Sequence, residues 1–181
     1  GDLEINNVSA GLIKLNLEDG ALKMRNIEGE LDIDIEDGDV TISDYSGNDC
    51  LIDIEDGQLD MERASGNFNI ESEDGDVELR YLRAGTLKAK SSDGDIYVDL
   101  LDSEEPDIEI RTEDGKAVID FDANISIEIE AETDDGHIKA DISNPEYEKK
   151  KRNYYFSEIN GGKGHMYIRT QDGNVVLREV K

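Results

Sequence analysis

A carboxylate followed by a glycine recurs through this chain at nearly constant spacing, and this pattern is the first candidate for chemistry. The Asp-Gly step occurs eight times, with Asp19, Asp37, Asp56, Asp74, Asp93, Asp114, Asp135 and Asp172. The glycines that follow them are separated by 18, 19, 18, 19, 21, 21 and 37 residues. A period of this size is typical of stacked repeats, in which equivalent residues lie above one another. Stacking would gather the eight carboxylates into one column, and carboxylate oxygens are ligands that calcium prefers.

Alternating side chains on both sides of each Asp-Gly step predict the strands that hold this column. The second and fourth residues after every such glycine are apolar. Most residues two, four and six places before the aspartate are apolar as well, and the positions between them are mostly polar or charged. This period of two is the signature of strands buried on one face. A second glycine series (Gly11, Gly29, Gly47, Gly66 and Gly85) falls nine or ten residues before the next Asp-Gly glycine. Each repeat therefore holds two strands and two corners.

We predict an all-β, single-domain parallel β-solenoid over residues 1–181, a flattened β-roll or β-helix with two short strands per rung. Each rung would take 18–21 residues, and there would be about eight rungs. Residues 2–10 are expected to form an N-terminal cap strand, and Val180 to help close the other end. An antiparallel sandwich is the alternative, because Asp-Gly between two alternating runs also favours hairpins.

The electrostatic repulsion among the carboxylates of the aspartate column must be offset by other interactions. Carboxylates one rung apart, roughly 4.8 Å, would repel by about 0.9 kcal/mol per pair in water. Seven such contacts approach about 6 kcal/mol, which is comparable to the stability of a domain. The side chains could accept backbone N–H groups at their own corners, point into water, or bind a divalent cation. The glycine-rich nonapeptide of calcium-binding β-rolls is absent, which weighs against calcium.

Residues that could act in catalysis do not form a recognisable set. A hydroxyl row precedes the later corners (Ser72, Ser91, Thr112, Thr133 and Thr170), and we expect it to bond the backbone of adjacent rungs. A serine nucleophile needs a positioned base, but His137 and His165 are the only histidines and have no metal-ligand spacing. Paired carboxylates could cleave glycans, but in so acidic a chain such pairs arise by chance. We expect no catalytic residue, and Cys50 is expected to be a buried apolar side chain.

Residues 144–164 interrupt the repeat and carry the candidate interaction residues. Asn144 and Pro145 break the strand, and a basic cluster followed by aromatic residues comes next: Lys149, Lys150, Lys151, Arg152, Tyr154, Tyr155 and Phe156. We expect a loop or hairpin that leaves the solenoid. Cations and aromatic rings on an acidic body could bind an anionic partner, a glycan or the acidic face of another copy. Alternatively, the segment folds back over the rod and neutralises it.

Composition and charge exclude several classes of partner. The 181 residues include 19 Lys and Arg against 46 Asp and Glu, a formal net charge of −27. Such a surface repels nucleic acid and anionic membrane surfaces. No run of 18 apolar residues predicts insertion into a membrane. The chain begins with Gly1 rather than Met, as after removal of a tag, so we expect that a targeting segment can lie upstream.

The repeat resembles a bacterial β-strand-repeat family of adhesin-like domains of unknown function. Short alternating strands that end in Ser/Thr-x-Asp-Gly are found at residues 72–77, 91–96 and 112–118, and the segment 161–175 is similar to the family's C-terminal rung. The similarity covers about residues 11–181. It implies a β-solenoid, a bacterial source and association with the cell envelope, and it transfers no catalytic residue. The basic-aromatic segment lies outside the family pattern.

Together these features predict a non-enzymatic structural or interaction module of the bacterial cell envelope or surface. Its location would be extracytoplasmic, with the cytoplasm as the alternative, and its partner would be a protein or a glycan. No cofactor is expected in this interpretation. The second interpretation is a calcium-binding β-roll whose stability or partner binding depends on the ion. A carbohydrate-active enzyme is the weakest alternative.

Overall fold

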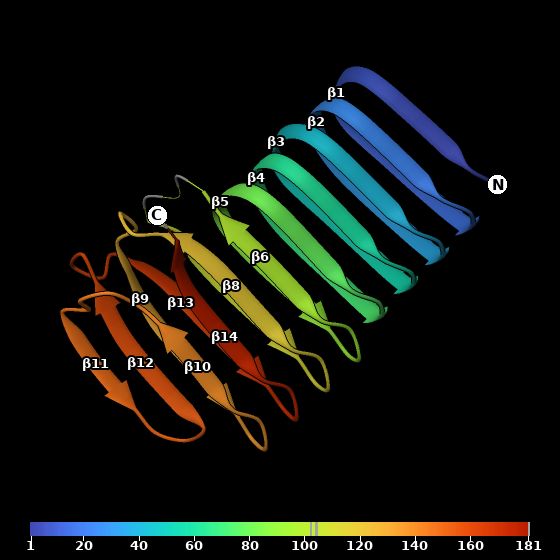
Figure 1. Ribbon diagram of the computed structural model, residues 1–181. Coiled ribbons are helices and arrows are strands. Elements are labelled where there is room, and N and C mark those ends of the chain that lie inside the picture. Colours follow the sequence, from blue (N-terminus) through green and yellow to red (C-terminus); the bar gives the residue numbers. More distant parts are fainter. Residues whose placement is uncertain (102, 104, 181) are drawn as a thin grey trace.

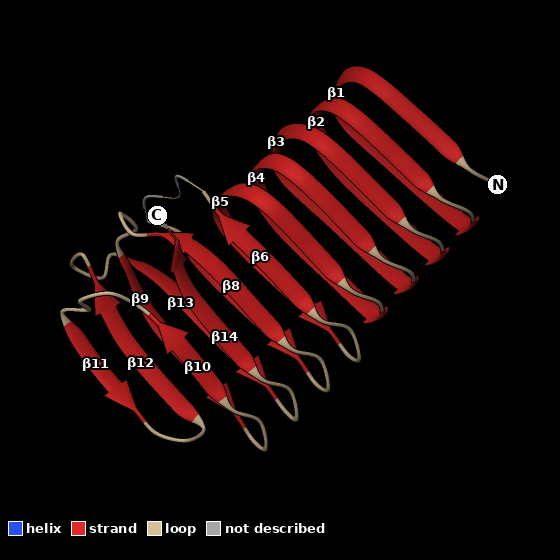
Figure 2. Cartoon of the chain, in the orientation of Figure 1, coloured by secondary structure: helices blue, strands red, loops and turns tan. Residues whose placement is uncertain are grey.

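The protein folds as a flattened parallel β-solenoid, as predicted. The computed structural model describes residues 1–101, 103 and 105–180, and these residues contain strands, turns and loops but no helix (Figures 1 and 2). The first five strands are long: β1 (Leu3–Asp19), β2 (Leu22–Asp37), β3 (Val40–Asp56), β4 (Leu59–Asp74) and β5 (Val77–Ser91). The later strands are shorter: β6 (Ile96–Leu100), β7 (Asp107–Thr112), β8 (Ala117–Asp122), β9 (Ile127–Thr133), β10 (Ile138–Asp141), β11 (Tyr147–Lys150), β12 (Tyr154–Ile159), β13 (Gly164–Thr170) and β14 (Val175–Val180).

Each of the first five strands runs through the second corner without a break, where two separate short strands were expected. The bend is made by one residue per strand with φ between 55° and 58°: Asn7, Asn26, Asp44, Arg63 and Tyr81. This left-handed residue begins the bend. A second change of direction follows three residues later in β2 and β4, at Gly29 and Gly66, where φ is 128° and 147° and the register of the ladder shifts. Each long strand is therefore folded into two halves, as the U-shaped ribbons of Figure 1 show.

The two halves build two sheet layers that enclose the core. The first layer contains the N-terminal halves of β1–β5, followed by β6, β8, β14 and β10. The second layer contains the C-terminal halves of β1–β5, followed by β7, β13, β9, β12 and β11. All neighbouring strands are parallel except β9–β12 and β12–β11. The apolar side chains of both layers point inward and form one continuous core.

The last rung in the sequence does not lie at the end of the rod. β13 pairs with β7 on one side and with β9 on the other, and β14 lies between β8 and β10 in the same way. The rung formed by residues 164–180 is thus inserted between two rungs that precede it in the chain. The expectation that Val180 closes the end is wrong: it pairs with Asp122 of β8 inside the first layer.

The connections explain how the chain leaves space for this inserted rung. Residues 122–127 step from β8 to β9 past the level that β13 and β14 occupy, which accounts for the longer corner there. The chain returns from β12 to β13 through Asn160, Gly161 and Gly162, whose φ values are 49°, 84° and 54°. The Asn160 Nδ2 group donates to the carbonyl oxygens of Ala123 and Ile125, both at 2.9 Å. These bonds fasten the return connection to the outgoing one.

The interior is narrow and almost wholly aliphatic. Two of its few rings, Tyr45 and Phe68, meet edge to face with their centroids 6.1 Å apart. Cys50 is fully buried, as expected, and burial raises the pKa of its thiol to about 12. A thiol that stays protonated is a poor nucleophile, so Cys50 acts in packing.

Candidate functional site

The glycines of the Asp-Gly steps stack in a single column at one side of the rod. A Cβ atom built on Gly38, Gly57 or Gly75 would lie 2.1, 2.2 or 1.8 Å from the carbonyl oxygen of the glycine in the preceding rung. No side chain fits at these distances. The column continues through Gly94 and Gly115, and the glycine of the inserted rung follows before Gly136. The corner motif is therefore required by the close approach of stacked backbones.

The eight corner aspartates are brought into a column along the surface of the rod. Asp19, Asp37, Asp56 and Asp74 are register partners on successive strands. All eight corner aspartates are exposed. Among the described residues, no three His, Cys, Asp or Glu side chains are grouped so that they could hold a metal ion. In the neighbouring glutamate row, lost hydration and then the charges of Glu36 and Glu73 raise the pKa of Glu55.

A second acidic ladder, on the residue after the glycine, bonds the backbone instead. The Oδ1 atom of Asp39 accepts the N–H of Gln58 at 3.1 Å, and Asp76 Oδ1 accepts the N–H of Asp95 at 2.8 Å. Asp95 in turn accepts the N–H of Lys116 at 2.7 Å. Each side chain bonds the equivalent residue of the next rung. Acceptance of backbone N–H groups was one of three possibilities for the corner aspartates, together with pointing into water and binding a cation. The aspartate after the glycine accepts the N–H instead, and the Asp-Gly-Asp triplet is the signal that could have identified it.

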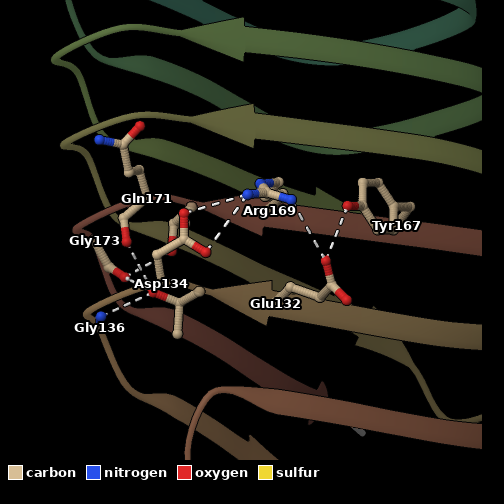
Figure 3. A network of polar contacts seen from close by, with 9 residues as sticks. Glu132, Asp134, Gly136, Tyr167, Arg169, Gln171 and Gly173 are labelled. Carbon is tan, nitrogen blue, oxygen red and sulfur yellow. Dashed lines mark hydrogen bonds and ion pairs between the residues drawn. The ribbon is translucent and has the colours of Figure 1, made fainter.

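Three of the five residues in the hydroxyl row, Ser91, Thr112 and Thr133, form the predicted bonds between rungs. The Thr133 hydroxyl donates to the Gly173 carbonyl oxygen at 3.0 Å and accepts the Gly136 N–H at 2.9 Å (Figure 3). In the same way, the Thr112 hydroxyl donates to the Gly94 carbonyl oxygen at 3.3 Å and accepts the Gly115 N–H at 3.0 Å. Ser91, like these two threonines, bonds both its own corner and the neighbouring rung. Ser72 and Thr170 donate only to the carbonyl oxygen of their own corner glycine, at 3.2 and 2.7 Å. All of these bonds satisfy buried backbone groups.

The outer face of the second layer carries cations that are neutralised by adjacent carboxylates. Arg169 of β13 reaches Asp134 at 3.2 Å and Glu132 at 3.7 Å, and Tyr167 donates to Glu132 at 3.3 Å (Figure 3). Lys90 pairs with Glu71 at 3.0 Å in the same way. These exposed pairs between neighbouring rungs stabilise the sheet only slightly, and they leave little free positive charge on this face.

The basic-aromatic segment forms a β-hairpin that stays in the sheet. β12 pairs antiparallel with β9, and β11 pairs antiparallel with β12, so β11 is the last strand of the second layer (Figure 1). Residues 144–164 therefore extend the rod where we had expected an excursion away from it. The two reversals return β11 to the direction of the solenoid strands.

The cations of this hairpin face solvent. Lys149, Lys150, Lys151 and Arg152 are all exposed, and none lies within 4.0 Å of a carboxylate among the described residues. Two of them lie over rings instead: the Nζ of Lys149 is 5.3 Å from the ring centre of Tyr154, and that of Lys150 is 5.7 Å from Tyr155. The hairpin does not fold back over the acidic rod.

The aromatic residues of the hairpin divide between surface and core. Tyr147 is 53% exposed and meets Phe156 edge to face at 5.9 Å. Tyr155 is completely buried, and burial raises the pKa of its phenol to about 12. Its hydroxyl and that of Ser157 are buried without a hydrogen-bond partner. Tyr155 therefore fixes the hairpin to the rod, while Tyr147, which sequence reasoning did not single out, lies on the accessible face with Phe156.

One hollow holds a close pair of acids. It measures about 340 Å³ on the outer face of the first layer and includes Asp60, Glu78 and Arg80. Burial, a hydrogen bond with Glu78 and the charge of Glu78 raise the pKa of Asp60. Glycosidase carboxyl groups keep about 5 Å or more between them, whereas these two groups bond to each other. The raised pKa of Asp60 is the result of partial burial and of a second acid on the adjacent strand.

A family model with the description Toastrack DUF4097 matches this chain twice, over residues 1–81 and over residues 62–178. The two matches together span nearly all of the solenoid and overlap in β4 and β5. No curated protein and no solved structure matches the chain. The described residues contain no helix long and apolar enough to cross a membrane.

Proposed function

The chain belongs to the Toastrack DUF4097 family, and on this premise we propose that it is a non-enzymatic interaction module. In this proposal the acidic solenoid is a rigid support, and the hairpin β11–β12 binds an anionic partner, either a glycan or an acidic protein segment. The observation that carries the proposal is the free positive charge of the hairpin, on a chain whose net charge is −27.

The contrast with the other cations supports this assignment. Lys14, Lys90 and Arg178 pair with carboxylates at 2.6, 3.0 and 2.5 Å, as most cations of the solenoid body do. The four adjacent cations at residues 149–152 have no such partner among the described residues. Exposed charges that are not neutralised within the chain can steer and select a partner of opposite sign.

The aromatic rings would add a second kind of contact. The exposed ring of Tyr147 and the half-buried ring of Phe156 form a pair beside Lys149, whose ammonium group already lies over Tyr154. Exposed tyrosines are common in binding surfaces because the ring supplies apolar area and the hydroxyl remains polar. A sugar ring or a peptide side chain could pack on this pair while its anionic group meets the lysines.

We also propose that the protein has no catalytic activity and works at a bacterial cell envelope or surface. The carboxyl groups with raised pKa values, such as Asp53, Asp60 and Asp99, lie on the sheet faces beside other acids. Partial burial, which is the largest cause of each raised pKa, and the charges of the neighbouring acids explain these shifts without a reaction. The envelope location is supported by the resemblance to bacterial adhesin-like repeat domains.

A matched pair of variants tests the hairpin. We would replace Lys149, Lys151 and Arg152 with serine, and separately replace Lys23, Lys116 and Lys139, three exposed lysines of the solenoid body without a carboxylate partner among the described residues. Both variants lose three positive charges. Binding to immobilised heparin and to poly-L-glutamate would be measured at several salt concentrations.

The hairpin variant should lose at least about tenfold in affinity for one of the two probes, or about 1.4 kcal/mol. The body variant should bind like the parent protein, and both should unfold at the parent temperature. If the two variants lost affinity equally, the loss would be explained by net charge alone, and this would contradict a localised site. Binding of the parent protein to neither probe would also contradict the proposal.

A further inference from the structure

The two ends of the rod differ in how their edge strands are protected. β11, at one end, has four residues and carries two lysines. β1, at the other end, has 17 residues and pairs with β2 and with no other described strand. Proteins usually blunt exposed edges with short strands and charges, and a long unprotected edge is a site for pairing with another chain.

The inward side chains of β1 are incompletely covered. Leu3, Ile5, Val8, Ile13, Leu15 and Leu17 pack against the core but remain partly exposed. Their register partners in β2 are at most 2% exposed (Leu22, Met24, Ile27, Leu31, Ile33 and Ile35). Both rows consist of aliphatic side chains. Their exposed fractions differ because β2 has a neighbouring strand on both sides, whereas β1 has one on a single side. One more pair of strands would complete the core at this end.

The sequence of β1 also lacks the charges that protect an edge. Between Ile5 and Leu17 the single charged residue is Lys14, whereas residues 24–35 of β2 include Arg25, Glu28, Glu30, Asp32 and Asp34. Leu12 is 57% exposed at the bend. In an otherwise strongly acidic chain, the edge strand is thus the segment least able to repel another strand.

We propose that β1 pairs with β1 of a second copy, so that two solenoids join end to end about a two-fold axis. Such an interface is self-complementary, and it closes at the dimer. The two copies would pair antiparallel in both layers and would continue the core from one copy to the other. The proposal concerns the opposite end of the rod from the hairpin and does not depend on the partner proposed there.

Charge supports this arrangement in the second layer. Lys14 and Glu18 lie two residues to either side of Asn16 and, like Asn16, point outward. Lys14 also pairs with Asp32 of β2 at 2.6 Å within the copy. An antiparallel pairing centred on Asn16 therefore places Lys14 of each copy opposite Glu18 of the other, and Leu15 beside Leu17 in the core. Opposite charges directly across two strands stabilise the pair.

A head-to-tail assembly fits less well. β11 offers four residues against the 17 of β1. The column of outward side chains that begins at Lys14 passes through Glu130 and Phe156 and ends at Lys149. Continued stacking in register would place Lys14 of the next copy beside Lys149, with like charges in contact. It would also produce an open filament, since head-to-tail contacts do not close.

The test is sedimentation velocity of the full chain over a wide concentration range. We expect a monomer–dimer equilibrium. Lys14→Glu should weaken the dimer by about tenfold because two attractive pairs become repulsive. The double change Lys14→Glu with Glu18→Lys restores opposite charges across the interface and should recover the dimer. Lys23→Glu, on the exposed face of β2, has the same effect on net charge as Lys14→Glu and should leave association unchanged.

Small-angle scattering then identifies the end that is used. Ten strands at about 4.8 Å give a rod of roughly 50 Å, and an end-to-end dimer should be close to twice as long. A monomer at every concentration would overturn the proposal. So would equal effects of the Lys14 and Lys23 changes, failure of the charge exchange to recover the dimer, or a dimer no longer than one copy.

Discussion

At the scale of single residues, distance explains why the corners contain glycine. A Cβ on Gly75 would lie 1.8 Å from the Gly57 carbonyl oxygen, whereas a Cβ on Gly11 would meet nothing within 4 Å. Gly75→Ala should therefore lower the free energy of unfolding by about 3 kcal/mol, as overpacking of a close contact does. Gly11→Ala should change it by less than about 1 kcal/mol. Urea unfolding of both variants measures this, and equal effects would contradict the stacked column.

The acid pair on the first layer gives a pH-dependent prediction. The folded pKa of Asp60 lies above its unfolded value of about 3.9. The group therefore contributes stability below the unfolded pKa and loses this contribution as the pH rises through the folded pKa. Asp60→Asn removes the charge next to Glu78, so it should raise the unfolding temperature at pH 7.

The same substitution should have a much smaller effect below pH 4, where Asp60 is already protonated. Thermal unfolding of parent and variant across this range checks the sign. A constant difference at every pH would mean that packing or a lost hydrogen bond, and not the carboxylate charge, determines the result.

The Asp-Gly-Asp triplet shows which features of a corner could be predicted from the sequence and which could not. The period predicted that equivalent residues stack, and the structure confirms this for Asp19 and Asp37. Which of the two aspartates accepts a backbone N–H is decided by the backbone angles of the corner. The second one, as in Asp76, faces the next rung. The Asp-Gly-Asp triplet marks this second aspartate as a candidate in the sequence, but it does not show which way the side chain points.

At the scale of strands, alternation predicted the elements but not their order in the rod. Ile108, Met166 and Ile129 occupy one inward column of β7, β13 and β9, and each of these strands ends in a threonine. Any of the three could stack on any other, because their inward faces are equivalent. The longer connection at residues 122–127 was visible in the sequence, but its cause is the rung that arrives later in the chain.

Deletion of this inserted rung should have a different effect from deletion of an end rung. Without residues 164–181, β7 and β9 lose their common neighbour, and the connections around them are built for a wider separation. We expect hydrogen exchange to show protection in β1–β5 and its loss in β9–β12. Deletion of residues 1–20, which removes a rung with one neighbour, should leave the other rungs protected.

The opposite result has a clear structural meaning. If β9 remained protected after deletion of residues 164–181, it would have stacked directly on β7 in the equivalent register. The inserted rung would then be an optional layer of the fold, and the length of the connection would not prevent the closer packing.

At the scale of the whole molecule, our proposals assign partner binding to the hairpin at one end of the rod and dimerisation to β1 at the other end. The hairpin is basic and short-edged, and the faces between the two ends are acidic. β1 at the opposite end is a long edge whose one charged residue between Ile5 and Leu17 is Lys14. A dimer joined through β1 would carry one hairpin at each far end. Two such sites could engage one extended anionic partner at once, which increases apparent affinity without any new contact.

The net charge of −27 makes the response to ions a test of the entire rod. Added salt should raise the unfolding temperature because it screens the repulsion among the carboxylates. The corner aspartates are exposed and contribute one carboxylate per rung. We therefore expect calcium and magnesium, compared at equal ionic strength, to give the same unfolding temperature in differential scanning calorimetry.

A specific calcium site would behave differently. An ion at about one hundred times its dissociation constant adds about 2.7 kcal/mol to the stability of the folded state. For a domain of this length the unfolding temperature would rise by roughly 5 to 10 °C. A rise of this size with calcium alone, reversed by a chelator, would show that the aspartate column binds the ion. Coincident curves would mean that water and diffuse counterions are sufficient to hold the acidic column together.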